Sequence, residues 1–350
     1  MQPRITDRQR EDHPSMLVIG GLAVAVVAVL AAPSTTWPYS CSAGTNVTTE
    51  HFALEGQVWL VTGADGRLGS RVTLSALRNG ARVVATSIDA ATATANCATL
   101  AHPNVSCLAM DLSSFSDIKK AVVTITQGEH TIDVIAHVAA TIGHPNVTSD
   151  GVVETVQVNT ISPALLTSLL AKELAAAKHP RVVHVGSANC YDPLGWPASN
   201  LVDAAVAWTT GKAPHPGSSP YYWYSFSKFV LLQYAAELAK RQPLLASFSV
   251  NPGFFRDDPQ KYADQCKPQL LFEPCPQWPD QGATSTFFTA AQPGIEGHSG
   301  SLIDFSTKIL KTSPFWVQSG DSCIPRPLPP PWSDAERAQW YDAVHKMFGA

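Results

Sequence analysis

The sequence predicts an α/β fold: a single doubly wound parallel sheet with a hydrophobic leader helix in front of it. The segment Gln57 to Thr62 (Gln-Val-Trp-Leu-Val-Thr) is short, apolar and β-rich, which is typical of a buried strand. A glycine-rich turn follows from Gly63 to Gly69, and a helical stretch runs from about Ser70 to Asn79. Ala81 to Thr86 reads as a second strand and completes a β-α-β unit.

The glycine-rich turn reads Gly63-Ala64-Asp65-Gly66-Arg67-Leu68-Gly69. Its three glycines let the chain turn tightly and let backbone N–H groups approach a phosphate at a helix N-terminus. Glycine spacing alone is a weak signal, but its place between a strand and a helix strengthens it. The turn therefore predicts a dinucleotide site, with a tight turn that binds no ligand as the alternative.

A Tyr-x-x-x-Lys pattern joins Tyr224 to Lys228, ahead of the helical-looking run Phe229 to Lys240. Residues four apart share a face of a helix, so the phenol and the ammonium can point into one pocket. A nearby cation lowers a tyrosine pKa from its reference of about 10, which favours proton transfer near neutral pH. The alternative is a surface pair on a helix. Tyr221 and Tyr222 lack this spacing to the lysine.

Five further motifs follow in order along the chain. They are Asp111-Leu112 after the strand-like segment Val105 to Met110, His137-Val138-Ala139-Ala140, Asn159 in Val-Asn-Thr, Ser187 at the end of Arg181-Val-Val-His-Val-Gly-Ser, and Asn251-Pro252-Gly253. With the glycine turn and the Tyr-Lys pair, these motifs resemble those of the short-chain dehydrogenase/reductase superfamily, whose members have a Rossmann fold. The resemblance runs from about Glu55 to near the C-terminus.

The resemblance implies a Ser-Tyr-Lys(-Asn) mechanism with a nicotinamide dinucleotide. The catalytic residues it implies are Ser187, Tyr224, Lys228 and Asn159. Tyrosine would exchange a proton with the substrate oxygen, lysine would lower the tyrosine pKa and hold the nicotinamide ribose, serine would bind the substrate oxygen, and asparagine would help relay protons. The cofactor-binding residues it implies are Thr62, Gly63, Asp65, Gly66, Arg67, Leu68, Gly69, Asp111, Leu112, Ala139, Tyr224, Lys228, Pro252 and Gly253.

Two branches of the superfamily are represented in the motifs. The glycine spacing, with Arg67 where the classical loop has glycine, and His137-x-Ala-Ala resemble the extended branch. The Pro252-Gly253 turn, the segment Glu296 to Gly300 and a final helix from Ser333 to Phe348 resemble the classical, retinol-dehydrogenase-like branch.

The function expected from these motifs is an NAD(P)-dependent oxidoreductase that interconverts an alcohol and a ketone or aldehyde. An apolar leader and an aromatic insert favour a small, lipophilic substrate. A sugar-nucleotide epimerase or dehydratase, and a dinucleotide-binding protein without turnover, remain alternatives. The insert lies among the 36 residues between Ser187 and Tyr224, includes Trp196 and Trp208, and is either a flap over the substrate or a surface loop.

The choice between NAD and NADP depends on the end of the second strand, Thr86-Ser87-Ile88-Asp89. An acid there would hold a ribose 2′-OH and favour NAD. Ser87 stands at the usual place of that acid, and Asp89 comes two residues later. Arg67 offers a charge to a 2′-phosphate, so we expect NADP.

The first 54 residues lie outside this domain, which we place at residues 55–350. Residues 1–15 form a polar tail, the uncharged run Met16 to Ala32 forms a membrane anchor or signal segment, and residues 33–54 form a linker. Arginines precede the apolar run, and no Lys or Arg follows it until Arg67, which predicts a cytosolic N-terminus and a lumenal catalytic domain. This predicts a single-pass protein of the endoplasmic reticulum or secretory pathway, secreted if the leader is cleaved.

Sequons and cysteines agree with a lumenal glycoprotein. Asn46, Asn104 and Asn146 each begin an Asn-x-Ser/Thr sequon. Among seven cysteines, the close pairs Cys97/Cys107 and Cys266/Cys275 are candidates for disulfides or for free buried thiols. The histidines lack metal-ligand spacing, so no metal site is expected. The net charge of −4 and the lack of a basic block argue against nucleic acid as a partner, while homo-oligomers remain open.

Overall fold

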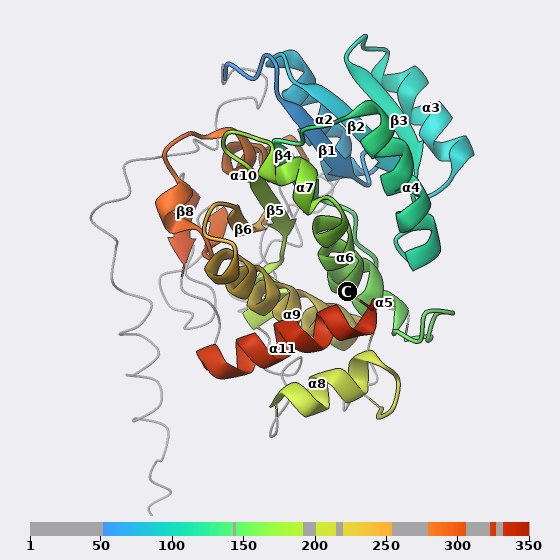
Figure 1. Cartoon of the computed structure of the whole chain (residues 1–350), viewed down its shortest axis with the longest axis vertical. Coiled ribbons are helices and arrows are strands. Elements are labelled where there is room, and N and C mark those ends of the chain that lie inside the picture. The colour runs from blue at the N-terminus through green and yellow to red at the C-terminus, as the bar shows by residue number, and fades with distance from the viewer. Residues whose placement is uncertain are drawn as a thin grey trace, which may run out of the picture.

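The computed structural model describes residues 52–142, 145–191, 201–214, 220–253, 279–305, 323–326 and 332–349. Its centre is an eight-stranded sheet of order β3-β2-β1-β4-β5-β6-β7-β8 (Figure 1). Seven strands are parallel, and β8 pairs antiparallel with β7. The strands are β1 (Val58–Thr62), β2 (Arg82–Ser87), β3 (Val105–Ala109), β4 (Val134–His137), β5 (Arg181–Val185), β6 (Ala246–Asn251), β7 (Leu302–Phe305) and β8 (Cys323–Arg326). The predicted doubly wound parallel sheet is confirmed.

The helices connect successive parallel strands and cover both faces of the sheet. They are α2 (Arg67–Arg78), α3 (Ala90–Leu100), α4 (Phe115–Gly128), α5 (Glu154–Val156), α6 (Ser162–Leu169), α7 (Ala171–Ala175), α8 (Leu201–Thr209), α9 (Pro220–Arg241), α10 (Pro279–Ala291) and α11 (Asp334–Met347). Short turns of other helix types are η2 (Gln157–Ile161), η3 (Ala188–Tyr191) and η6 (Glu296–His298). Figure 1 shows α11 lying along α9, on the outside of the fold.

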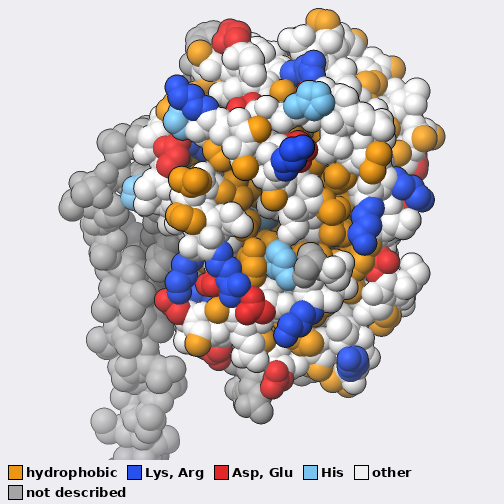
Figure 2. Space-filling model, in the orientation of Figure 1, with side chains coloured by type: hydrophobic (Ala, Val, Ile, Leu, Met, Phe, Trp, Pro, Cys, Tyr) orange, Lys and Arg blue, Asp and Glu red, His pale blue; other side chains and the backbone are white. Residues whose placement is uncertain are grey.

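Two hydrophobic layers enclose the sheet because its strands alternate their apolar side chains between the faces. Leu60, Ile135 and Val182 pack with α4, α6, α9 and α11 on one face. Val61 and Val183 pack with α2 and α10 on the other. Figure 2, in the orientation of Figure 1, shows hydrophobic side chains gathered near the centre of the molecular surface on the side where α9 and α11 lie, with charges of both signs around them. The core is therefore continuous on each side of the sheet.

The first helix begins earlier than the sequence predicts. It starts at Arg67 because Gly66, with extended backbone, serves as its N-cap. The third glycine of the motif therefore lies inside the helix, where a Cβ at Gly69 would overlap the Gly63 carbonyl. Close packing of the helix on the turn, rather than the turn itself, requires this glycine.

The C-terminal segment agrees with the prediction of a final helix. Ser333 caps α11 through a capping box with Glu336. Before this helix, Pro325 and Arg326 form part of β8, an edge strand in which proline is tolerated. Residues 327–331 lie outside the described residues.

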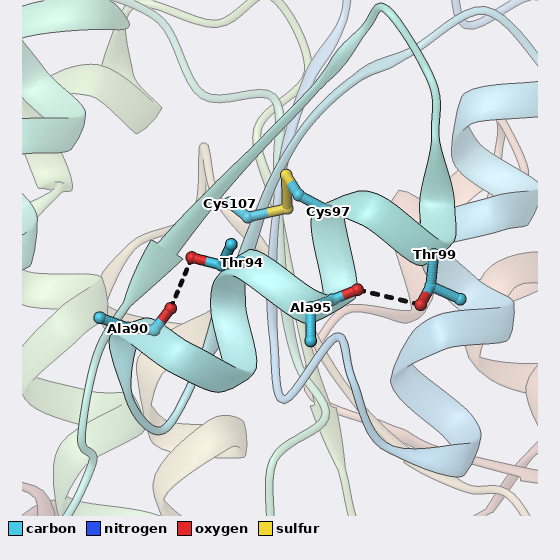
Figure 3. The surroundings of a disulfide bond; sticks show 6 residues. All are labelled: Ala90, Thr94, Ala95, Cys97, Thr99 and Cys107. Atoms are coloured by element: carbon cyan, nitrogen blue, oxygen red, sulfur yellow. Dashed lines mark hydrogen bonds between the residues drawn. A yellow bond between two sulfur atoms is a disulfide. The ribbon is translucent and has the colours of Figure 1, made fainter.

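One of the two candidate disulfides is formed. Cys97 of α3 is bonded to Cys107 of β3 (Figure 3). The bond joins the last strand on one side of the sheet to the helix that precedes it. Cys266/Cys275, the sequon at Asn46 and the apolar run Met16 to Ala32 lie outside the described residues. Within the described ranges, no helix is long and apolar enough to cross a membrane.

A buried arginine holds the end of β5 that lies farthest from the carboxyl edge of the sheet. The guanidinium of Arg181 donates hydrogen bonds to the carbonyl oxygens of Thr289 (2.8 Å), Ala290 (3.2 Å) and Gln292 (2.9 Å). It also forms an ion pair with Glu296, at 2.5 Å. One side chain thus satisfies the carbonyl groups at the end of α10 and ties them to the sheet.

We expect Arg181→Met to destabilise the protein by about 2–4 kcal/mol, because it leaves these carbonyl groups without their donor. Chemical denaturation measures the change in the free energy of unfolding. Lys120→Met is the control: Lys120 pairs with Asp117 at the exposed surface, and its loss should cost less than about 1 kcal/mol. Equal effects of the two substitutions would contradict this account.

Candidate active site

The end of β1 packs tightly against the end of β4. Thr62 Oγ1 accepts hydrogen bonds from the N–H groups of Val138 (3.0 Å) and Ala139 (3.2 Å). Gly63 has a φ of +63°, and a Cβ there would lie 2.9 Å from Cα and Cβ of Ala139. Thr62, Gly63 and Ala139, which the sequence assigns to one site, are therefore in contact.

The start of α2 is suited to an anion. No side chain caps the helix at Gly66, and its first turn contains no acidic residue. The first N–H groups of a helix have no partner within it, and the helix dipole favours negative charge there. Asp65 and Arg67 are exposed beside this end, whereas the side chain of Leu68 is buried in the core. Only the backbone of Leu68 is thus available to a bound cofactor.

The residues after β3 form hydrogen bonds that fix their loop. Asp111 Oδ1 accepts hydrogen bonds from the N–H and the hydroxyl of Ser113, both at 2.8 Å. The Leu112 carbonyl accepts a hydrogen bond of 2.5 Å from Ser162 of α6. These bonds hold the loop that follows β3 at the carboxyl edge of the sheet, where the Gly63 turn also lies.

The predicted catalytic pair lies on the first half of α9. Lys228 is 1% exposed, and its ammonium donates a hydrogen bond of 2.7 Å to the carbonyl of Val185, at the end of β5. The Lys228 Nζ atom is 5.6 Å from the centre of the Tyr224 ring. The Ser187 side chain is near enough to the Tyr224 phenol to lower its pKa, and the Ser187 hydroxyl donates a hydrogen bond of 3.2 Å to the side-chain oxygen of Asn189. The structure therefore brings Ser187, Tyr224 and Lys228 together.

Burial sets the acid–base properties of this group. Desolvation raises the pKa of Tyr224; the hydrogen bond from Ser187 opposes this, and the nearby Cys190 thiol adds to it. Desolvation lowers the pKa of Lys228 to about 7. Lys228 would therefore be neutral where Tyr224 ionises, so in this structure it does not give the lowered tyrosine pKa that the spacing predicts.

The side chain of Asn159 connects two backbone segments of the site. It lies in η2, a π-helical turn of the kind that is frequent at functional sites. Its amide nitrogen donates to the Thr141 carbonyl and to the Ser227 hydroxyl, both at 2.9 Å, and its oxygen accepts from the Thr141 N–H at 2.8 Å. Ser227 Oγ in turn donates to the carbonyl of Tyr224, at 2.8 Å. Asn159 thus ties the loop after β4 to the catalytic part of α9.

The turn after β6 is closed by a side chain. Gly253 has a φ of +76°, and its N–H donates a hydrogen bond of 3.1 Å to the side chain of Asn251. The N–H of Gly186, just before Ser187, donates to the Val250 carbonyl at 2.7 Å. Pro252 and Gly253 therefore lie beside the strand end that carries Ser187.

Two features of the site were missed by sequence reasoning. Cys190, buried in η3, affects the pKa of both Tyr224 and Lys228. His184, one residue before the lysine's partner Val185, is fully buried against His137. In the sequence, His137 indicated only a resemblance to the extended branch of the superfamily. No local pattern could have paired the two histidines, because their contact depends on the register of β4 against β5, in which His137 aligns with His184.

Comparison with known proteins assigns the family. Residues 57–198 match the family model described as short chain dehydrogenase. An uncharacterized oxidoreductase of Schizosaccharomyces pombe is 26% identical over 263 residues, which cover 69% of this chain and 74% of the relative. Retinol dehydrogenase 11 of Mus musculus is 25% identical over 263 residues, covering 73% of this chain and 79% of the relative.

The match and the relatives support a place in the short-chain dehydrogenase/reductase superfamily, and the retinol dehydrogenases among them favour its classical branch over the extended one. A solved structure titled as the RhlG/NADP active-site complex of Pseudomonas aeruginosa has the same fold as this chain. The TM-score is 0.55 with 23% sequence identity, over 73% of this chain and 96% of that one.

The close approach of Gly63 to Ala139 leads to a prediction about dinucleotide binding. Gly63→Val should weaken NADPH and NADH binding by at least about tenfold, because overlap and a positive φ each cost ~1–3 kcal/mol. Quenching of tryptophan fluorescence during titration measures the dissociation constant, and a melting curve reports whether the variant folds.

Gly128→Ala is the matched control, since a Cβ at Gly128 meets nothing within 4 Å. It should leave dinucleotide affinity unchanged. A folded Gly63→Val variant with wild-type affinity would show that the turn does not bind the cofactor.

Proposed function

We propose that this NAD(P)-dependent oxidoreductase interconverts an alcohol and a ketone or aldehyde on a lipophilic substrate, with Ser187, Tyr224 and Lys228 in the catalytic roles. The observation that carries the proposal is the meeting of three groups: the Lys228 ammonium lies 5.6 Å from the Tyr224 ring, one turn along the same helix, and the Ser187 side chain is near enough to the phenol to affect its pKa. Two hydroxyl groups that meet at the carboxyl edge of the sheet can bind one substrate oxygen together.

The arrangement fits a dinucleotide. Backbone N–H groups at the start of α2 suit a pyrophosphate, and Gly63 leaves room that a side chain would fill. Asp111 and Leu112, Ala139, and the Pro252-Gly253 turn follow parallel strands of one sheet, so they lie along its carboxyl edge. These residues would hold the cofactor, which supplies or accepts the hydride when bound.

The proton chemistry belongs to the chain itself. In reduction, Tyr224 donates its phenolic proton to the carbonyl oxygen of the substrate, and Ser187 donates a hydrogen bond to the same oxygen. Below a pH of about 7, where Lys228 is charged, its ammonium stabilises the phenolate that remains. Asn159 acts as a positioning residue through Ser227. In oxidation of an alcohol, the same groups act in reverse.

We favour NADP over NAD. Asp89 is the N-cap of α3, where its carboxylate accepts a hydrogen bond of 2.8 Å from the Thr92 N–H, so it is committed to the helix. Ser87 is buried and Ile88 is 62% exposed, so the end of β2 offers no other acid to a ribose 2′-OH. Arg67 at the start of α2 supplies a positive charge for a 2′-phosphate. Titration with NADPH and NADH in parallel tests the preference.

A lipophilic substrate is favoured by apolar side chains in segments near the site. Ile142 and Val147 are half exposed in the loop after β4, and Tyr221 is exposed one turn before Tyr224. These side chains would contact an apolar substrate and not a nucleotide sugar. The classical relatives also argue against the epimerase alternative, while a dinucleotide-binding protein without turnover stays an outcome of the assay below.

We propose that the catalytic domain lies on the lumenal or extracellular side, anchored or exported by Met16 to Ala32. The Cys97–Cys107 disulfide supports an oxidising compartment. The sequon residues Asn104 and Asn146 are exposed, as glycan attachment requires.

Replacing Tyr224 tests the proposed chemistry. Tyr224→Phe keeps the ring and removes the hydroxyl, so turnover in a screen of alcohols and ketones should fall about 10²–10⁴-fold while dinucleotide affinity is retained. Tyr221→Phe and Tyr222→Phe are the matched controls and should change turnover far less. Activity within a few-fold of wild type in Tyr224→Phe would refute the mechanism. Dinucleotide binding without any turnover in the wild type would favour the non-catalytic alternative.

Glycosidase treatment tests the proposed compartment. Protein expressed in animal cells should shift in mobility, and Asn104→Gln with Asn146→Gln should remove the part of the shift that these residues cause. A wild-type protein that does not shift, and that protease digests in intact microsomes, would place the domain in the cytosol.

A further inference from the structure

The hydroxyl group of Ser187 is held inside its own turn. It donates a hydrogen bond of 3.2 Å to the side-chain oxygen of Asn189, and its Oγ accepts one of 3.2 Å from the Asn189 backbone N–H. A serine hydroxyl has one proton to donate and two lone pairs that accept. In this structure the one proton of Ser187 is therefore taken by Asn189.

The backbone of this turn is fixed on both sides of the serine. The Gly186 N–H donates to the Val250 carbonyl at 2.7 Å, and a Cβ at Gly186 would lie 3.0 Å from the Leu232 side chain. On the other side, the Cys190 N–H donates to the Ser187 carbonyl at 3.1 Å, and the buried Cys190 side chain packs with Leu232 of α9. Because the backbone is held, the hydrogen bonds of Ser187 can change only by rotation of side chains.

Asn189 can either take the serine proton or release it. Its amide has an oxygen that accepts and an NH2 group that donates, and a half-turn of the amide about χ2 exchanges the two. With the NH2 group toward Ser187, the amide donates to Oγ and leaves the serine proton for another acceptor. Asn189 is half-buried, and within the described part of the chain its amide is hydrogen-bonded to Ser187 alone, so no other described group fixes its orientation.

The proposed reduction needs the serine proton on the substrate. When hydride reaches a carbonyl carbon, negative charge develops on the carbonyl oxygen, and donors aimed at that oxygen lower the barrier. Tyr224 supplies one donor, and Ser187 supplies the second only when its proton is not on Asn189. The substrate oxygen and the Asn189 oxygen therefore compete for one proton.

We propose that Asn189 is a positioning residue that directs the Ser187 hydroxyl. In the empty site its amide oxygen takes the serine proton. When a carbonyl substrate binds, the amide turns over, its NH2 group holds Oγ, and the serine proton is donated to the substrate oxygen. The inference rests on the proposed oxidoreductase function. No covalent bond forms or breaks in this step, and no electron or charge is transferred.

A neutral amide suits the surroundings of this turn. Tyr224 and Lys228 of α9 are the ionisable groups beside it, and Cys190 within the turn affects the pKa of both. Desolvation already raises the pKa of Tyr224. A carboxylate at position 189 would raise it further, whereas an amide supplies both an acceptor and a donor without adding a charge.

Replacing Asn189 with Asp tests the inference, because Asp has the same shape but its carboxylate can only accept. For the ketone that is reduced fastest in the screen described above, kcat should fall about 10²-fold, the usual cost of losing one donor to a developing oxyanion. KM should change less than about threefold, and the NADPH dissociation constant should not change. Asn189→Leu, which leaves the serine proton free but Oγ unsupported, should lower kcat only about three- to tenfold. A residue that only packs would show the opposite order.

A double-mutant cycle with Ser187→Ala separates the serine proton from the added charge. Ser187→Ala has no proton to direct, so adding Asn189→Asp to it should change kcat by less than about twofold. Asn104→Asp is the matched control, since it makes the same chemical change at an exposed residue before β3 and should leave kcat unchanged. The inference is refuted if Asn189→Asp alone leaves kcat within about twofold of wild type, or lowers it equally with and without the Ser187 hydroxyl.

Neutron diffraction from crystals of deuterium-exchanged protein provides a measurement that does not need turnover. Without substrate, the deuteron on Ser187 Oγ should point at the side-chain oxygen of Asn189. If the wild type reduces no ketone, the proposed function fails, while a deuteron in this position still identifies Asn189 as the residue that holds the serine hydroxyl. A deuteron that points away from Asn189 would refute the inference whatever the kinetics show.

Discussion

The hydrogen bond from Lys228 to the Val185 carbonyl is the contact on which the rest of the site depends. It places a buried amine at the end of β5, which fixes the rotation of α9 over the sheet. With that rotation set, Tyr224 lies one turn earlier on the same side of the helix and meets Ser187. Burying an amine costs free energy, which the apolar residues around it offset, since Phe226, Phe229 and Val230 of α9 are fully buried.

Burial also explains why the acid–base behaviour departs from the expectation based on spacing. A lysine four residues from a tyrosine lowers the tyrosine pKa only while the lysine is charged. In this fold Lys228 is fully buried and Tyr224 is partly buried, and desolvation is the largest effect on the pKa of each. Any charge placed beside Tyr224 and Lys228 therefore shifts their pKa values strongly. The neutrality of His184 and His137 avoids adding a competing positive charge next to Lys228.

The parts of the fold that could be predicted from sequence are those set by local chemistry. The alternation of strand, glycine turn and helix identified β1, α2 and β2 within three residues, and Ser333 marked the start of α11. The site residues could be grouped because parallel strands bring their carboxyl ends to one edge.

What could not be predicted depends on contacts between distant residues. The role of Gly69 follows from packing against the Gly63 carbonyl, and the partners of Asn159 include Ser227, 68 positions away. The contact between His137 and His184 depends on the register of β4 against β5, which no local pattern specifies. Burial, too, is a property of the folded chain, so the pKa of Lys228 could not follow from its spacing to Tyr224.

The two outermost strands of the sheet have a consequence for self-association. An outermost strand offers unpaired N–H and C=O groups to another chain and so invites intermolecular strand pairing. At one side, β8 contains Pro325, which has no N–H to offer. At the other side, β3 is short and is covalently fastened to α3 through Cys107, so it cannot easily peel away to pair elsewhere. The missing N–H donor of Pro325 in β8 and the disulfide that holds β3 both oppose edge-to-edge aggregation of the sheet.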